Sequence, residues 1–159
     1  MSQRLNYMQQ SPVAFKKLVD LSMALKESGV EHVLQCLVEI RASQLNGCAF
    51  CLDMHVKQAV IGGERALRLH HVALWRESPL FSARERAALL WTETLTRIPD
   101  TGVSDAVYAE VREQFNEKDL CDLTWLVSSI NAWNRLNVAF QSVPGSQDKA
   151  FGLDKAGLA

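Results

Sequence analysis

Helix start and stop signals recur along almost the whole chain, and they constrain the fold more than any other feature of the sequence. Ser82, Ser104 and Asn116 each stand before an apolar segment, where their side chains can accept from the free N–H groups of a first helical turn. Glu85 lies three residues after Ser82, which is the spacing of a capping box. Within the segments, apolar residues recur three or four positions apart, as is typical of amphipathic helices.

This pattern predicts an all-α fold of about six to seven helices. No segment alternates apolar and polar residues as a strand does. We expect residues 1–142 to form one domain that oligomerises through helix faces. Residues 143–159, rich in Gly, Ser, Lys and Asp, are predicted to be a flexible or partner-contacting C-terminal tail. The expected helices cover about residues 12–28, 31–46, 48–61, 64–75, 82–98 and 104–115, with a last long helix from 116 onward.

The composition excludes several classes of protein. A chain of 159 residues, 48% apolar and 22% charged, has enough material for the core and surface of one domain. Seventeen basic against eighteen acidic residues give a net charge of −1, so the basic footprint of a nucleic-acid-binding protein is missing. There is no apolar run of the roughly 18 residues that cross a bilayer, and no secretory signal at the N-terminus. We therefore expect a cytoplasmic protein that binds neither nucleic acid nor membrane.

The chemistry of the sequence is concentrated at Cys48, Cys51 and His55. Gly47 is expected to end one helix, so that Cys48 begins the next and Cys51 lies one turn further in. The unpaired N–H groups and the positive dipole end of a first turn favour a thiolate. His55 follows Cys51 by four residues on the same face, where an imidazole can take the thiol proton and return one to a leaving group. Attack on a peroxide would give a sulfenic acid, which the second thiol would convert to a disulfide.

Other interpretations of the cysteines stay open at this point. The CxxCxxxH group could bind Zn²⁺, with Cys36 or Glu39 as a fourth ligand. The chain has no second CxxC and no HxxxH pair, and a domain of this size has less need of a structural metal, so we expect no metal and no cofactor. Cysteines can also be plain core residues, and we favour this role for Cys36 and Cys121, which lie among apolar neighbours.

Residues 38–55, which include Gly-Cys-Ala-Phe-Cys-Leu-Asp-Met-His, resemble the core of the alkylhydroperoxidase D-like proteins of the carboxymuconolactone decarboxylase superfamily. Residues 81–89 and 129–136 are also similar to that family. The resemblance implies an all-helical homo-oligomer, often a trimer or hexamer. It implies that Cys51 is the peroxidatic thiol, that Cys48 resolves the sulfenic acid and meets the reductant, and that His55 relays the proton. It also implies a dithiol reductant, of which a lipoyl-bearing protein is the best-known example.

The chain departs from the family pattern at two positions. The family carries a proton-relay glutamate twelve residues before the first cysteine, and here that position is Cys36. Glu39 lies almost one helical turn later, and we expect it to approach the same space from another angle. In some relatives a second histidine precedes the second cysteine, where this chain has Phe50. Losing both groups would leave His55 with less support for its tautomer and basicity.

The function predicted from these residues is a thiol-dependent peroxidase that acts on hydrogen peroxide or organic hydroperoxides. Its site residues would be Cys51, Cys48, His55 and Glu39. A redox-sensing or regulatory CxxC oligomer with little turnover is the main alternative, because the relay glutamate is displaced. A lactone decarboxylase, the founding activity of the superfamily, is less favoured because that chemistry does not need a paired thiol.

Overall fold

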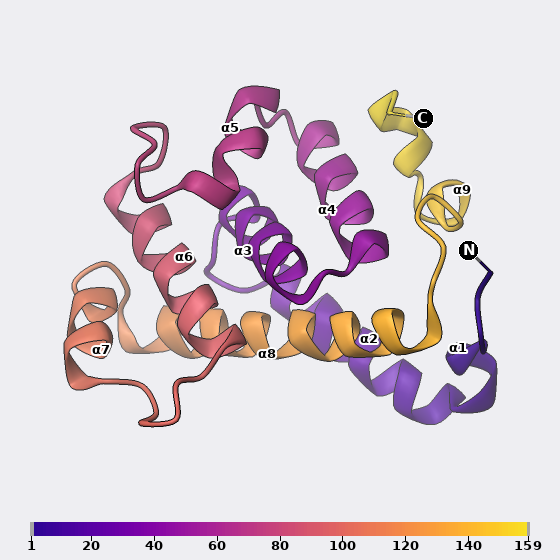
Figure 1. The fold of residues 1–159 in the computed structure, drawn as a ribbon, viewed down its shortest axis with the longest axis horizontal. Coiled ribbons are helices and arrows are strands. Elements are labelled where there is room, and N and C mark those ends of the chain that lie inside the picture. Colours follow the sequence, from indigo (N-terminus) through magenta and orange to yellow (C-terminus); the bar gives the residue numbers. More distant parts are fainter. Residues whose placement is uncertain (1, 159) are drawn as a thin grey trace.

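The computed structural model describes residues 2–158, which fold into helices and loops without any strand (Figure 1). The all-α prediction is confirmed. None of the described helices has the length and apolar character needed to cross a membrane. The elements, in chain order, are α1 (Tyr7–Gln10), α2 (Pro12–Lys26), α3 (His32–Asn46), α4 (Ala49–Ile61), α5 (Ala66–His71), the 3₁₀ helix η1 (Val72–Leu74), α6 (Ala83–Thr96), α7 (Asp105–Arg112), α8 (Glu117–Phe140), α9 (Asp148–Phe151) and the 3₁₀ helix η2 (Leu153–Ala156).

Three of the helices begin at the predicted caps. Ser82 Oγ accepts from the Glu85 N–H at 3.2 Å, and the Glu85 carboxylate accepts from the Ser82 N–H at 2.7 Å, which completes the capping box. Ser104 and Asn116 accept in the same way from N–H groups at the starts of α7 and α8. The helix predicted over residues 64–75 is instead divided, because α5 passes directly into the tighter turn of η1.

Helix α3 lies at the centre of the fold and packs against α4, α6 and α8. Residues 34–38 are all buried, so no side of the helix faces solvent there. Leu34 and Val38 join an apolar cluster with α6, α7 and α8, whereas Leu37 and Ile40 join a second cluster with α4, α5 and α6. A helix that is buried on every side has its position fixed by its neighbours. The start of α4, which directly follows α3, is therefore held firmly as well.

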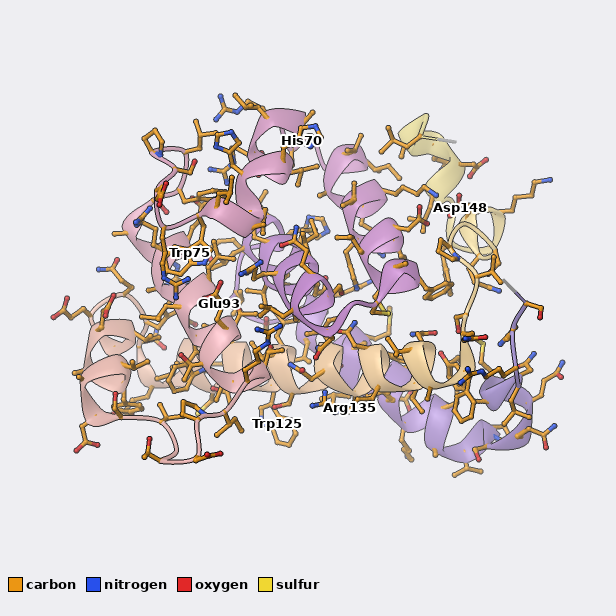
Figure 2. The ribbon with its side chains drawn as sticks, viewed as in Figure 1. His70, Trp75, Glu93, Trp125, Arg135 and Asp148 are labelled. Atoms are coloured by element: carbon orange, nitrogen blue, oxygen red, sulfur yellow. The ribbon has the colours of Figure 1, made fainter. Side chains whose placement is uncertain are left out.

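An ion cluster adds a polar connection between α3 and α6. The Glu93 carboxylate of α6 accepts from Arg41 of α3 at 2.7 Å and from Arg76 at 2.6 Å. The indole N–H of Trp75 donates to the same carboxylate at 2.9 Å, and Figure 2 shows Trp75 close to Glu93. Burial alone would raise the pKa of Glu93, but these three donors hold it below its usual value. The cluster is therefore stable as an ionised group.

Helix α8 runs along the longest axis of the molecule, with α7 at one end (Figure 1). Helix α1 and both chain ends lie at the other end. The outer face of α8 carries Trp125, whose side chain is 58% exposed and projects away from the other helices (Figure 2). Cys121 on the same helix is also exposed, so the prediction that it packs in the core is wrong. The apolar neighbours of Cys121 in sequence, Leu120 and Leu123, point to the opposite, buried side.

The C-terminal segment folds back against α4 (Figure 1). The Lys57 side chain of α4 is 7% exposed, and its ammonium lies 2.9 Å from Asp53 and 2.7 Å from Asp148 of α9. Asp148 is labelled in Figure 2. Leu153 of η2 is 3% exposed. A buried ammonium requires carboxylate partners and a buried leucine requires apolar contacts. Residues of α9 and η2 therefore contact α4 in this structure, and the expectation that residues 143–159 form a flexible or partner-contacting tail stays a prediction.

Candidate active site

The corner between α3 and α4 places two cysteines at a helix start. Gly47 ends α3 in the left-handed conformation, with a φ of 65°, which favours glycine over residues with a Cβ. Cys48 then takes an extended conformation as the N-cap of α4, and Cys51 falls in the first turn. Both side chains are buried, with 2% and 1% exposure. The structure thus brings together the two thiols that the sequence singles out.

The two thiols are close enough to share a proton. Their Sγ atoms lie 2.8 Å apart, and the backbone N–H of Cys51 donates to Cys48 Sγ at 3.4 Å. The hydrogen bond between the two sulfurs has the largest effect and lowers the pKa of Cys48, against the opposing effect of burial. The same hydrogen bond, together with burial and the charge on Cys48, raises the pKa of Cys51. Of the two thiols, Cys48 is therefore the one that loses its proton more readily.

His55 lies one turn after Cys51 and is held through a single ring nitrogen. Its Nδ1 is 3.0 Å from Glu39 Oε2 and 2.9 Å from Gln58 Oε1. Because both neighbouring atoms are acceptors, Nδ1 carries the proton, and the neutral imidazole keeps its lone pair on Nε2. Nε2 is therefore the ring atom that is free to take a proton from a thiol.

Glu39 supports the basicity of this histidine. Burial has the largest single effect and lowers the pKa of His55. The charge of Glu39 and the hydrogen bonds with Glu39 and Gln58 raise this pKa and together outweigh burial, so the pKa of His55 lies above its usual value. The carboxylate at position 39 thus reaches the histidine although the family glutamate position holds Cys36. The structure shows this contact, and the part that Glu39 would play in catalysis stays a prediction.

Cys36 lies apart from the thiol pair. It belongs to the apolar cluster between α3, α4, α5 and α6, and its Sγ is 4.0 Å from His32 Nδ1. Burial raises the pKa of this thiol to about 12, so it stays protonated. Among residues 2–158, no three His, Cys, Asp or Glu side chains are placed so that they could hold one metal ion. The zinc ligand set considered from the sequence is therefore not assembled.

Sequence reasoning alone misses two residues beside Cys51. The Asn137 amide donates to Cys51 Sγ at 3.4 Å and to the Trp133 carbonyl at 2.9 Å, while its oxygen accepts from the Tyr7 hydroxyl at 3.1 Å. Every polar atom of this amide has a partner, so its N–H group is held toward the sulfur. Burial, and then the charge on Cys51, raise the pKa of Tyr7 to about 12, so the hydroxyl stays a donor.

The spacing of asparagines on α8 is the signal that could have found Asn137. Asn131, Asn134 and Asn137 recur every three residues and form one buried polar face of the helix. The Asn46 amide of α3 donates to the oxygens of Asn131 and Asn134, both at 2.9 Å. The Asn134 amide donates to Ser43 Oγ at 3.1 Å. This network fixes α8 against the end of α3, directly before the cysteines.

A cavity of about 180 Å³ opens beside Cys51. Its walls are mostly aromatic, methionine and aliphatic side chains from α1, α2, α4 and α8. Cys51, His55 and Glu39 line it, whereas Cys48 does not. The sulfur that a small molecule in this cavity would meet first is therefore that of Cys51.

Both ends of the chain contribute to the walls of this cavity. Tyr7 and Met8 come from α1, and Phe151 comes from α9. Phe50, at the place where some relatives carry histidine, adds a further apolar wall from α4. The cavity is thus suited to a molecule with an apolar body and a group that reacts with a thiol.

Removing the Asn137 side chain is expected to slow alkylation of Cys51. Asn137→Ala deletes the donor that faces Cys51 Sγ. The thiolate of Cys51 is the form that reacts with iodoacetamide, and a hydrogen bond to such a charged group contributes about 1.5–3 kcal/mol. The rate with iodoacetamide, resolved for Cys51 by fragment mass spectrometry, should fall about 10- to 100-fold. Tyr7→Phe, which only frees the orientation of the amide, should have a smaller effect in the same direction. Cys121 in the same samples is the internal control, and an unchanged Cys51 rate in both variants would contradict the contact.

Comparison with known proteins identifies a family and several relatives of this chain. The model of the Carboxymuconolactone decarboxylase family matches residues 12–94. The uncharacterized protein YdfG of Bacillus subtilis (strain 168) is 39% identical over 139 residues, which are 87% of this chain and 95% of that protein.

Two solved structures are also similar. One is a protein of unknown function from Agrobacterium tumefaciens, provisionally described as the antioxidant defence protein AhpD. It is 38% identical and has a TM-score of 0.86, and the match covers 90% of this chain and 98% of that chain. The other is a peroxidase-related protein with an alkylhydroperoxidase AhpD core from Ralstonia eutropha JMP134, with a TM-score of 0.77, over 88% of this chain and 75% of that chain. The second is 20% identical and therefore shows only a shared fold. Together with the family match, these relatives show that the chain belongs to the carboxymuconolactone decarboxylase family, as an AhpD-like member.

Proposed function

We propose that this protein is a thiol-dependent peroxidase that reduces hydrogen peroxide or organic hydroperoxides through a Cys48/Cys51 dithiol–disulfide cycle. The observation that carries the proposal is the position of Cys51. Its sulfur is 2.8 Å from a second thiol and lines a cavity together with a histidine whose Nδ1 is held by a carboxylate. A nucleophile, a resolving thiol and a base are the groups that this reaction requires.

In the first step the Cys51 thiolate attacks the terminal oxygen of the hydroperoxide. The Cys51 proton passes first to His55 Nε2. A sulfur–oxygen bond forms and the oxygen–oxygen bond breaks, so that the sulfur is oxidised to a sulfenic acid and the peroxide is reduced. Protonated His55 then supplies a proton to the departing alkoxide or hydroxide, which leaves as an alcohol or water.

In the second step the Cys48 thiolate attacks the sulfenic sulfur of Cys51. The sulfur–sulfur bond forms as the sulfur–oxygen bond breaks, and the hydroxide leaves as water after it has taken a proton from the solvent, which restores the proton that Cys48 lost when it became a thiolate. The lowered pKa of Cys48 suits this role, because the thiolate is the attacking species. An external dithiol would then restore both thiols by thiol–disulfide exchange. A lipoyl-bearing protein as this dithiol, and a homo-oligomeric assembly, are parts of the same proposal.

Mass mapping of the thiols tests this function. One equivalent of cumene hydroperoxide is added to the reduced protein, and the tryptic peptide over residues 42–57, which holds both cysteines, is analysed. We expect a rapid loss of two hydrogens from this peptide, with Cys36 and Cys121 unchanged. Both thiols remaining free would refute the proposal.

The redox-sensor alternative differs in turnover. It has a specific observation in its favour, since the family glutamate position is occupied by Cys36. With an excess of peroxide and dithiothreitol, a sensor would form the disulfide but consume almost no further peroxide, whereas an enzyme would continue for many cycles. This second measurement decides between the two functions.

A further inference from the structure

A second cavity, of about 330 Å³, adjoins the cavity beside Cys51. The two share Lys26, Glu39, Gln58 and Phe151 among their lining residues. The shared Glu39 is the carboxylate that contacts His55. A molecule that reacts at Cys51 could therefore extend past this group into the second cavity.

The charged side chains around the second cavity are mostly basic. Lys26 and Lys155 line it, and Glu39 carries the opposite charge. No ion pair among residues 2–158 involves either lysine. Lys57 of α4 is different, because its ammonium already has two carboxylate partners. The ammonium groups of Lys26 and Lys155 can thus form ion pairs with an anionic ligand.

The Glu39 carboxylate and the ends of three helices also affect the electrostatic potential in this second cavity. Glu39 is the acidic residue in the lining, and its carboxylate lies 3.0 Å from His55, which offsets its charge when protonated. Helices α2 and α4 end at the cavity while α3 begins there. The partial charge of a helix end is about half a unit, so the two C-terminal ends and one N-terminal end together leave about half a negative charge, against two full positive charges on the lysines. The full charges of the lysines therefore set the sign.

We propose that the substrate is an amphiphilic acid, with its apolar body in the cavity beside Cys51 and a carboxylate in the second cavity near Lys26 and Lys155. This rests on the proposed function, which it narrows from hydroperoxides in general to carboxylate-bearing ones. The walls of the cavity beside Cys51 are mostly apolar, so the substrate carboxylate is not expected to lie in that cavity. Lys26, which lines both cavities, stands where the apolar and anionic parts of such a molecule would meet.

Calorimetric titration of the reduced protein with octanoate and with octan-1-ol tests the subsite without any peroxide chemistry. Octanoate should bind more tightly than the alcohol, and its affinity should fall as salt is added. Lys26→Gln and Lys155→Gln should each weaken octanoate about two- to fivefold, the range of a solvent-accessible ion pair. Neither variant should change the affinity for the alcohol. Lys17→Gln is the matched control, since Lys17 is exposed on the same helix as Lys26 and lines neither cavity.

Equal affinity for the two ligands, no binding of octanoate, or equal losses in Lys26→Gln and Lys17→Gln would overturn the proposal. These outcomes are independent of the thiols, so they are distinguishable from a failure of the peroxidase assay. With an active enzyme, the kcat/KM of a fatty-acid hydroperoxide should exceed that of its methyl ester. Lys26→Gln should bring the two values together.

Discussion

A Cys51→Ser variant is expected to lose peroxide turnover by about three orders of magnitude or more, as enzymes do when a covalent nucleophile is removed. Serine has nearly the same shape, but its hydroxyl is far less acidic and less nucleophilic than a thiol. Peroxide consumption in the presence of dithiothreitol is the measurement. Cys121→Ser is the matched control, because Cys121 is exposed on α8 and lies outside the site.

The Cys48→Ser variant separates the two thiols. It should still react with about one equivalent of peroxide, because Cys51 lines the cavity and keeps His55 as its neighbour. The product should be a sulfenic acid that dimedone traps on Cys51, with no intramolecular disulfide. Turnover that persists in Cys51→Ser but vanishes in Cys48→Ser would exchange the proposed roles of the cysteines.

Replacing Glu39 by glutamine is expected to lower kcat/KM by about 10- to 100-fold, the range found for carboxylates that hold a working histidine in metal sites. The carboxylate can only accept from His55 Nδ1, and so it fixes the proton there. A glutamine amide can also turn and donate, which would stabilise the wrong tautomer. Glu110→Gln, at an exposed position on α7, is the matched control.

The pH dependence of the Glu39→Gln variant has a definite sign. His55 accepts a proton only in its neutral form, so activity should rise as pH increases through its raised pKa. Loss of the Glu39 charge lowers this pKa, and the rise should move to lower pH even though the maximum rate falls. Titration of the His55 ring protons by NMR gives the same pKa without turnover. A pKa and a rate profile that do not move would rule out Glu39 as the partner that tunes His55.

Much of the fold follows from local sequence rules. The caps at Ser82, Ser104 and Asn116, and the stop at Gly47, set helix ends that the structure reproduces closely. The CxxCxxxH spacing also places its residues correctly, because helix geometry over two turns is nearly fixed. These features depend on neighbours in the sequence, which is why they are predictable.

The rest of the site depends on contacts between distant segments. Tyr7 and Asn137 are 130 residues apart in sequence, and no local pattern pairs them. Asp148 of α9 pairs with Lys57, a lysine whose side chain is largely buried although lysine is normally exposed. Cys121 fails for a similar reason, because its apolar neighbours on α8 face the core while it faces outward. The position of a residue on a helix, and not the hydrophobicity of the segment around it, decides its burial.

Because α9 helps to enclose the cavity beside Cys51, the order of protein synthesis affects the reactive thiols. Cys48 and Cys51 leave the ribosome about a hundred residues before Phe151, at an elongation rate of about 5–20 residues per second. For several seconds the nascent chain therefore contains the thiol pair but not the residue that completes its wall. Until Phe151 has been synthesised, the cavity beside Cys51 therefore lacks the part of its wall that α9 supplies.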